Sequence, residues 1–199
     1  MAGLLFAALA FFVVGKAAVV RSDAQGAADA AALAAAGDAR DHLVPGIDLL
    51  TLEPEEWREV LEGGHLDPAG SCGAAREFAT RNAATALCEP APPRFTVEVT
   101  TDNSVGDSVV PGASGKRGKA TATAVVEPRC RLGGVVAGPS ASPPTSAPSP
   151  SPSPSPGGEE KPTAVEIKCK GGGVLRFDPA KPDPWSTLAR TLFAVRLVD

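Results

Sequence analysis

Residues 22–40 read SDAQGAADAAALAAAGDAR. Alanine has the highest helix propensity of all residues, and no proline interrupts the chain between this stretch and Pro45. Because an apolar run directly precedes the stretch, the two should form one unbroken helix. We expect that helix to extend from about Leu4 to Arg40, which is roughly 55 Å at 1.5 Å per residue.

Small side chains form two rows along this expected helix. Alanines recur every four residues, so that one row is Ala24, Ala28, Ala32 and Ala36 and the other is Ala27, Ala31 and Ala35. Such rows let helix backbones approach closely, whereas an alanine-rich helix can also simply face solvent. We favour packing of the first row against copies or partner subunits. Leucine at positions 28 and 32 should then disturb assembly without unfolding the rest of the chain.

An apolar segment opens the chain. Residues 2–15 read AGLLFAALAFFVVG, and residues 17–20 extend the run past the single charge of Lys16. A helix of about 20 apolar residues can cross a bilayer, so we expect residues 1–21 to form a transmembrane anchor. A cleaved signal peptide and a buried core helix are the alternatives.

The charges that flank the apolar segment and the rest of the sequence predict opposite orientations of the anchor in the membrane. Lys16 and Arg21 follow the apolar run, and the positive-inside rule alone would leave the C-terminus in the cytoplasm. The four cysteines and a proline/serine-rich stretch instead favour an extracytoplasmic C-terminal domain. Either Asp23 and Asp29 offset the bias, or the true start lies upstream and carries basic residues. We favour the second explanation and expect a single-pass cell-membrane protein.

The string VVRSDAQGAADAAALAAA after an apolar segment resembles the TadE/TadG-like proteins of tight-adherence (Flp-type) pilus assembly. The resemblance covers about residues 4–40 and is carried by Gln25 and residues 27–35. It implies a membrane-anchored, pilin-like or accessory component that contacts other pilus or secretion-assembly subunits through its N-terminal helix. Minor pilins of the family have a prepilin-type cleavage site with a glutamate five residues on. No glutamate occurs here before Glu53, so prepilin processing is in doubt.

Composition argues against several function classes. The 199 residues hold 19 Lys and Arg against 23 Asp and Glu, and a net charge of −4 provides no basic surplus for nucleic acid. His42 and His65 are isolated, and no Gly-x-Ser-x-Gly or Ser-x-x-Lys string occurs. The basic turn GASGKRGKAT at 112–121 fails the phosphate-loop pattern, because Arg117 follows Gly115-Lys116. We expect no enzyme activity, no cofactor and no metal.

The residues after Asp41 predict a small α+β domain. Pro54 suits the first turn of a helix that Gly63-Gly64 end, with Trp57, Val60 and Leu61 packed inward. A second helix is expected at 71–81, with Ser71 as its cap and a left-handed Asn82 at its end. Its inward side chains should be Ala75, Phe78 and Ala79.

Alternating residues predict strands. Phe95, Val97 and Val99 share one face of an expected strand at 95–101, and residues 119–127 form a second β-prone run. The C-terminal tail should begin as a helix with Pro184 in its first turn, where Trp185, Leu188, Ala189 and Leu192 share a face. It should close as a strand in which Phe193, Val195 and Leu197 alternate with polar or smaller residues.

A linker interrupts this domain. Residues 137–163 contain nine of the 20 prolines, so we expect them to be disordered or polyproline II in conformation. The expected organisation is therefore an anchor (1–21), an alanine-rich helical extension (22–41), the first part of the α+β domain (42–136), the linker (137–163) and a completing segment (164–199).

The sequences on either side of the linker are similar. Residues 127–136 and 166–175 both read Glu-x-basic-Cys-basic-x-Gly-Gly-Val-aliphatic. The similarity is either chance or a sign that the two segments are neighbours, with Cys130 facing Cys169 across a hairpin whose loop is the linker. A long loop would add little closure entropy, since that entropy grows only logarithmically with length.

The other two cysteines have two geometric options. If residues 73–87 were all helix, Cys72 and Cys88 would lie too far apart to bridge, whereas a helix ending at Asn82 would let the chain return. The TadE/TadG resemblance favours the second option. Zinc is the competing explanation for four cysteines, but no Cys-x-x-Cys occurs. We expect the disulfides Cys72–Cys88 and Cys130–Cys169.

Two functions remain open on the sequence alone. The first is the membrane-anchored pilus or secretion-assembly component that the resemblance implies. The alternative is a secreted or cell-wall-proximal binding module with no pilus role, which would use the proline/serine stretch for reach.

Overall fold

A computed structural model describes residues 2–43, 51–104, 115–136, 164–178 and 185–198. The fold is α+β, as expected, and the linker predicted at 137–163 lies outside the described residues. Its elements in chain order are α1 (Ala2–Asp41), α2 (Pro54–Glu62), α3 (Ser71–Arg81), β1 (Ala84–Ala91), β2 (Arg94–Ser104), β3 (Arg117–Pro128), β4 (Cys130–Val136), β5 (Ala164–Cys169), β6 (Val174–Phe177), α4 (Trp185–Leu192) and β7 (Phe193–Val198).

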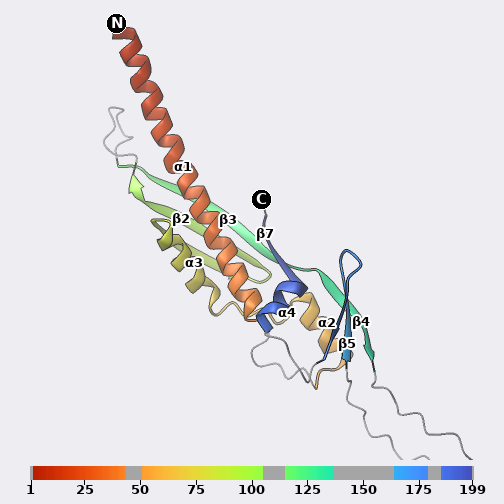
Figure 1. The fold of residues 1–199 in the computed structure, drawn as a ribbon. Helices are drawn as coiled ribbons and strands as arrows, with labels where there is room; N and C mark the ends of the chain where they lie inside the picture. Colours follow the sequence, from red (N-terminus) through yellow and green to blue (C-terminus); the bar gives the residue numbers. More distant parts are fainter. Residues whose placement is uncertain (1, 44–50, 105–114, 137–163, 179–184, 199) are drawn as a thin grey trace, which may run out of the picture.

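The long helix α1 has two different surroundings. Its N-terminal half projects beyond the rest of the molecule, and its C-terminal half lies along a sheet (Figure 1). The expectation of one continuous helix through residue 40 is confirmed. The alanine-rich half, however, is a layer of the domain rather than a separate extension ahead of it, because eight of its alanines are at most 1% exposed.

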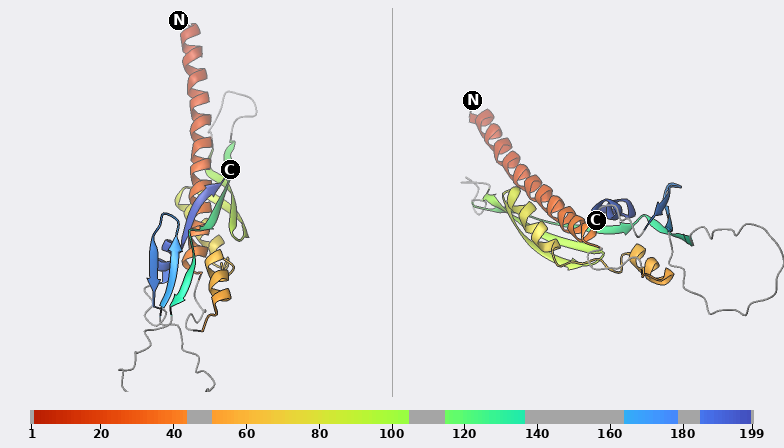
Figure 2. Two further views of the ribbon diagram at one scale, coloured as in Figure 1. Left: turned by 90° about the vertical axis from the view of Figure 1, so that its right-hand side faces the viewer. Right: turned by 60° about the horizontal axis from the view of Figure 1, so that its bottom comes forward.

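That sheet has four antiparallel strands in the order β1-β2-β3-β7. Phe95, Val97 and Val99 on β2 are fully buried and face the helices, as their alternation predicts. The opposite face carries Glu98 and a bond between the hydroxyls of Thr96 and Thr123, 3.0 Å apart. Helices therefore cover one face of this sheet and leave the other to solvent (Figure 2).

The helix α3 lies beside α1 on the covered face, and β1 returns along it. The return begins where Ala83 takes a positive φ of 50°, whereas Asn82, expected to do so, has φ −99°. Asn82 instead donates its side-chain amide to the Phe78 carbonyl at 2.8 Å. The disulfide Cys72–Cys88 then joins α3 to β1 across a Cα separation of 5.5 Å.

Two further expectations for α3 are wrong. Ser71 does not cap the helix: Gly70 occupies the cap position, and the Ser71 hydroxyl donates to the Pro68 carbonyl at 2.7 Å. Phe78 does not face inward, because it is 39% exposed and lies under the Arg81 guanidinium. Ala75 and Ala79 are buried as expected.

A second, three-stranded sheet has the order β4-β5-β6. Cys130 and Cys169 are paired residues of β4 and β5 and form the second expected disulfide. The similar segments on either side of the linker are thus neighbouring antiparallel strands. Only Arg129 separates β3 from β4, so the two sheets follow each other along one continuous chain path.

The short helices close the remaining core. α2 begins with a capping box, in which the Glu53 backbone N–H donates to Glu56 at 2.7 Å, and ends at Gly63 with φ 87°. Its buried Trp57 meets Phe177 of β6 edge-on, with ring centroids 6.2 Å apart. α4 buries Leu188, Ala189 and Leu192 and runs directly into β7, as the tail sequence predicts.

The crossing of α1 and β3 depends on one glycine. A Cβ added to Gly118 would lie 2.5 Å from the Val20 carbonyl oxygen and 3.0 Å from the Ala24 Cβ. The buried Thr101 hydroxyl accepts the Gly118 N–H at 2.9 Å, which fixes this part of β3. The helix therefore approaches the strand as closely as its backbone allows, at the point where it leaves the sheet.

We predict that Gly118→Ala lowers the free energy of unfolding by about 1–3 kcal/mol, because α1 must move away from β3. Gly26→Ala is the matched control: a Cβ there meets nothing within 4 Å, and alanine is favoured over glycine in a helix by about 0.5–1 kcal/mol. Urea unfolding in nonionic detergent checks both variants. Equal effects of the two substitutions would contradict the close approach.

Candidate functional site

The projecting half of α1 exposes large apolar side chains. Their exposed fractions range from 51% at Leu9 to 81% at Phe11, and the group is Leu4, Phe6, Leu9, Phe11, Phe12, Val14 and Val19. A soluble domain normally covers contiguous apolar surface, and a large uncovered patch marks a contact with lipid or protein. By length and hydropathy, none of the helices in the described part of the chain qualifies as a membrane-spanning segment.

The alanine rows do not form part of that exposed surface. Ala24, Ala28, Ala32 and Ala36 are all 0% exposed, and the second row is equally buried. Both rows pack into the same core as β2, β3 and α3. The expectation that the first row meets a copy or partner subunit is therefore wrong, because its small side chains allow α1 to lie close to the chain's own sheet.

The C-terminal end of α1 is joined to α4 by an ion pair. Asp41 accepts hydrogen bonds from Arg190 at 2.8 Å and from its neighbour Arg40 at 2.8 Å. Burial raises the pKa of the Asp41 carboxyl, but the hydrogen bonds and charges of the two guanidinium groups outweigh it, so that its pKa lies below the usual range. The pair ties the two helices together at neutral pH.

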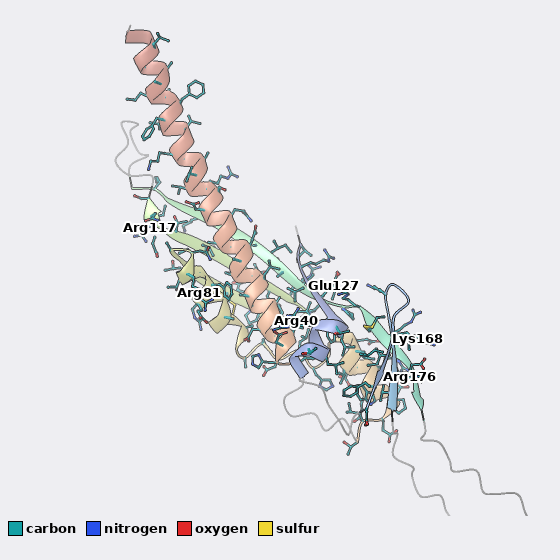
Figure 3. All side chains as sticks on the ribbon, viewed as in Figure 1. Arg40, Arg81, Arg117, Glu127, Lys168 and Arg176 are labelled. Atoms are coloured by element: carbon teal, nitrogen blue, oxygen red, sulfur yellow. A yellow bond between two sulfur atoms is a disulfide. The ribbon has the colours of Figure 1, made fainter. Side chains whose placement is uncertain are left out.

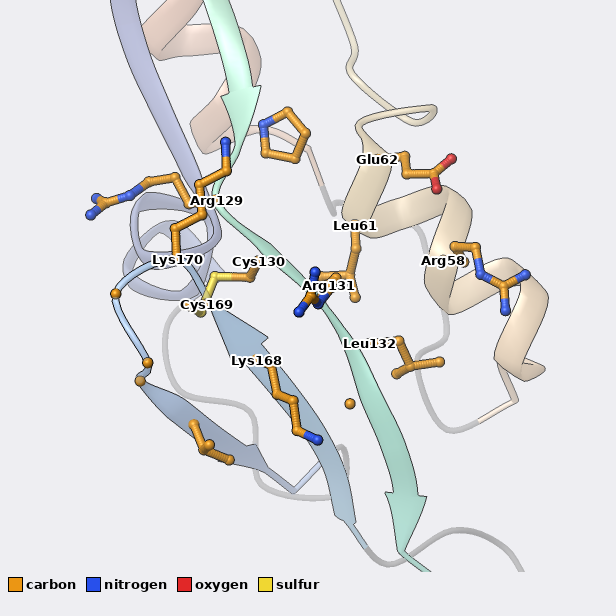
Figure 4. Close-up of a pocket in the computed structure, with 16 residues that line it drawn as sticks. Arg58, Leu61, Glu62, Arg129, Cys130, Arg131, Leu132, Lys168, Cys169 and Lys170 are labelled. Atoms are coloured by element: carbon orange, nitrogen blue, oxygen red, sulfur yellow. A yellow bond between two sulfur atoms is a disulfide. The ribbon is translucent and has the colours of Figure 1, made fainter.

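A cavity of about 940 Å³ lies where α2 meets the second sheet (Figure 4). Its lining includes the Cys130–Cys169 disulfide, the glycine turn 171–173 and one carboxylate, Glu62. The cations in the lining outnumber that carboxylate. They are Arg58 on α2, Arg131 on β4 and Arg129 just before it, and Lys168 on β5 and Lys170 just after it. The lining therefore carries five cationic side chains and one carboxylate.

Sequence reasoning did not assign these cations. The signal was present, because the repeated pattern basic-Cys-basic reads Arg-Cys-Arg at 129–131 and Lys-Cys-Lys at 168–170. The repeat predicts neighbouring strands, and such strands carry their flanking charges into proximity. Pairing the strands brings the two basic segments together.

The two histidines and the cysteines lie in separate places. His42 contacts the Asp38 carbonyl oxygen at 2.9 Å, and His65 lies 3.9 Å from Glu59. All four cysteines are in disulfides. Among the residues that the structure describes, no three histidine, cysteine or acidic side chains are grouped as metal ligands would be.

The N-terminal part of the chain, which contains most of both halves of α1, is similar to a known family. Residues 1–38 match the family model described as putative Flp pilus-assembly TadE/G-like. The match confirms the resemblance found in the sequence and extends to the N-terminus of the projecting half. No curated protein and no solved structure matches the chain.

The segment that matches the TadE/G-like model includes the exposed apolar half of α1 and most of its buried, alanine-rich half. The match suggests involvement in Flp, or tight-adherence, pilus assembly, and it relates the protein to pilus machinery at the cell envelope. The segment ends three residues before Asp41, so the ion pair with Arg190 and everything after it lie outside the matched region.

We predict that Ala32→Leu destabilises the domain by about 1–3 kcal/mol, because the added carbons have no space between α1 and the sheet. This replaces the expectation that leucine in the alanine row leaves the domain folded. Ala30→Leu, at a partly exposed position of the same helix, should change the free energy of unfolding by less than about 0.5 kcal/mol. Thermal unfolding followed by circular dichroism compares the two. A stable Ala32→Leu protein would disprove the intramolecular packing.

We predict that Asp41→Asn lowers the urea midpoint at pH 7. A carboxyl whose pKa is depressed by folding stabilises the fold above its unfolded-state pKa of about 3.9, and this contribution is lost as the pH falls through the lower folded-state value. The difference between wild type and variant should therefore shrink below about pH 4. Asp23→Asn, exposed on the same helix, should leave the midpoint unchanged at every pH. A difference at position 41 that persists in acid would contradict the ion pair's role.

Proposed function

We propose that the protein is a membrane-anchored component of a tight-adherence pilus or related secretion assembly, either pilin-like or accessory. The observation that carries the proposal is the coincidence of two features. The family match covers residues 1–38, and the same segment contains the exposed apolar side chains of α1. The role is one of assembly rather than catalysis.

The cost of exposed apolar surface supports membrane attachment. Each large side chain of the projecting half gains about 1.5–3 kcal/mol when it leaves water, and seven such side chains are exposed between Leu4 and Val19. Lys16 is close enough to the end of the apolar run for its ammonium group to reach the interface. In this proposal the projecting half is held in the cell membrane and the folded domain lies on its outer side.

Partner contacts are assigned to the same projecting half. The alanine rows are used inside the domain, so the proposal assigns the contact of another subunit with α1 to the exposed apolar side chains before Ala24. Lipid and neighbouring helices can share those side chains, as in bundles of membrane helices. The two disulfides support an extracytoplasmic location, since disulfides persist in oxidising compartments.

We predict that Leu9→Lys combined with Phe12→Lys releases the protein from the membrane fraction. Each lysine at the centre of an apolar helix costs about 2.5–3.5 kcal/mol on insertion scales. The wild-type protein should resist alkaline carbonate extraction and co-purify with pilus-assembly subunits, and the double variant should lose both properties. Its disulfides and near-ultraviolet circular dichroism should remain, because both side chains are exposed.

Ser22→Lys with Gln25→Lys is the matched control, since it adds the same charges at the same spacing on exposed positions beside the domain. It should behave as the wild type. Extraction of the wild-type protein by carbonate would refute integral attachment. Retained co-purification by the released double variant would show that assembly does not use the projecting half. Mass spectrometry of the mature N-terminus separates this proposal from a secreted binding module, which requires the apolar segment to be cleaved off.

A further inference from the structure

Four cations surround the second disulfide in a regular arrangement. Arg131 and Lys168 are directly paired across β4 and β5, and the Lys170 N–H donates to the Arg129 carbonyl at 2.7 Å one step along the chain. We call these four residues the cation array. Neighbouring members lie roughly 5 Å apart across the strands and roughly 7 Å apart along them.

Carboxylates neutralise the array incompletely. Lys168 lies 3.8 Å from Glu166, but the same carboxylate also lies 3.8 Å from Arg176. Arg129, Arg131 and Lys170 make no ion pair within the described residues, and all three are exposed. Glu127, the acidic residue just before them, accepts a hydrogen bond from Arg196 and is close enough to Lys170 to be attracted by its charge, although the two form no ion pair.

Like charges directly opposite each other weaken a strand pair. The two strands place Arg131 opposite Lys168 and Arg129 beside Lys170. Without a bound anion, this arrangement therefore weakens the pairing of β4 with β5. The Cys130–Cys169 disulfide lies between the two pairs and holds the strands together against that repulsion. An anion bound between the cations would remove the repulsion and gain attraction from both strands.

The space beside the array is open. The cavity of about 940 Å³ extends from the array to α2, where it reaches Arg58, whose guanidinium group donates a hydrogen bond to Glu55. Gly171 and Gly172 turn the chain after Lys170 with φ of 96° and 86°, and a Cβ at either would meet nothing within 4 Å. The volume of this cavity is at the upper end of the range for ligand pockets, and it is larger than a single small anion.

We propose that the cation array and its cavity bind a linear polyanion that carries phosphate groups. Arginine donates two parallel hydrogen bonds to phosphate oxygens, and lysine adds a point charge, so one phosphate can bridge a member of each strand. The spacing along β4 and β5 lets a second phosphate of the same polymer contact the next pair. The site lies at the end of the molecule away from the projecting half of α1 (Figures 1 and 3).

Arginines and lysines on an edge strand have a competing role, because they discourage pairing with another chain. β4 is an edge of the three-stranded sheet, so the array could act in this way alone. Such a role needs no ligand. Binding to the full-length protein therefore decides between the two roles, and it does so whether or not the protein is membrane-anchored.

The test uses long-chain inorganic polyphosphate and the full-length protein in nonionic detergent, with affinity measured over a series of salt concentrations. We expect binding that weakens with salt, and a loss of at least about tenfold in affinity for Arg131→Gln combined with Lys168→Gln. The slope of log affinity against log salt should fall by roughly 1–2, as expected when two phosphate contacts are removed. Arg131→Lys keeps the charge but loses the parallel hydrogen bonds, so its affinity should lie between those of the wild type and the double variant.

Arg117→Gln with Lys119→Gln is the matched control. It removes one arginine and one lysine from exposed positions of β3, and Figure 3 places Arg117 near the other end of the molecule. It should change the affinity less than about twofold. If both double variants lost the same affinity, the effect would be explained by net charge alone, and the proposal would be overturned. Absence of binding by the wild type, or equally tight binding of monomeric phosphate or polyglutamate, would also overturn it.

Discussion

The close contact between α1 and the four-stranded sheet is the constraint on which the rest of the domain depends. Alanine on the helix side allows the backbone of α1 to lie near β2 and β3, and the larger Phe95, Val97 and Val99 fill the space from the sheet side. Burying alanine orders no side-chain rotamers, so the contact loses little conformational entropy. α3 then packs beside α1, with Gly70 so near Asp38 that a Cβ would lie 2.5 Å from its carboxylate. The short helix α4 is joined to the same helix through Asp41.

Much of this arrangement could be predicted from local sequence. The positions of the helices and of β2, β3 and β7 follow from alanine content, alternation and turn residues, although β2 and β3 extend beyond the expected 95–101 and 119–127. The pairing of β4 with β5 is one of the two interpretations that the repeated cysteine motif allows. Both disulfides join the expected cysteines. The end of α3 is harder to predict, because asparagine tolerates a positive φ more readily than alanine, yet Ala83 and not Asn82 adopts it at the start of β1.

The partner of a helix face could not be predicted in the same way. A row of alanines shows that something approaches closely, and it does not distinguish the chain's own sheet from another subunit. The answer depends on Gly118 and on the buried face of β2, both distant in sequence from α1. The cation array could not be predicted for a related reason. Arg131 and Lys168 become neighbours only when β4 and β5 are paired, and each segment alone resembles an ordinary solvated strand end.

The division of α1 into a projecting and a buried half has a consequence for any proteolytic maturation of the chain. A cut before Ala24 would leave every buried alanine in place and release an intact domain. A cut at one of the small-residue sites between residues 27 and 36 would remove part of one core layer and expose the apolar face of the sheet. The position of a cleavage therefore decides whether the product is a folded, released domain or an aggregation-prone fragment. Processing or truncation preserves the fold only when it ends at or before the boundary near residue 20.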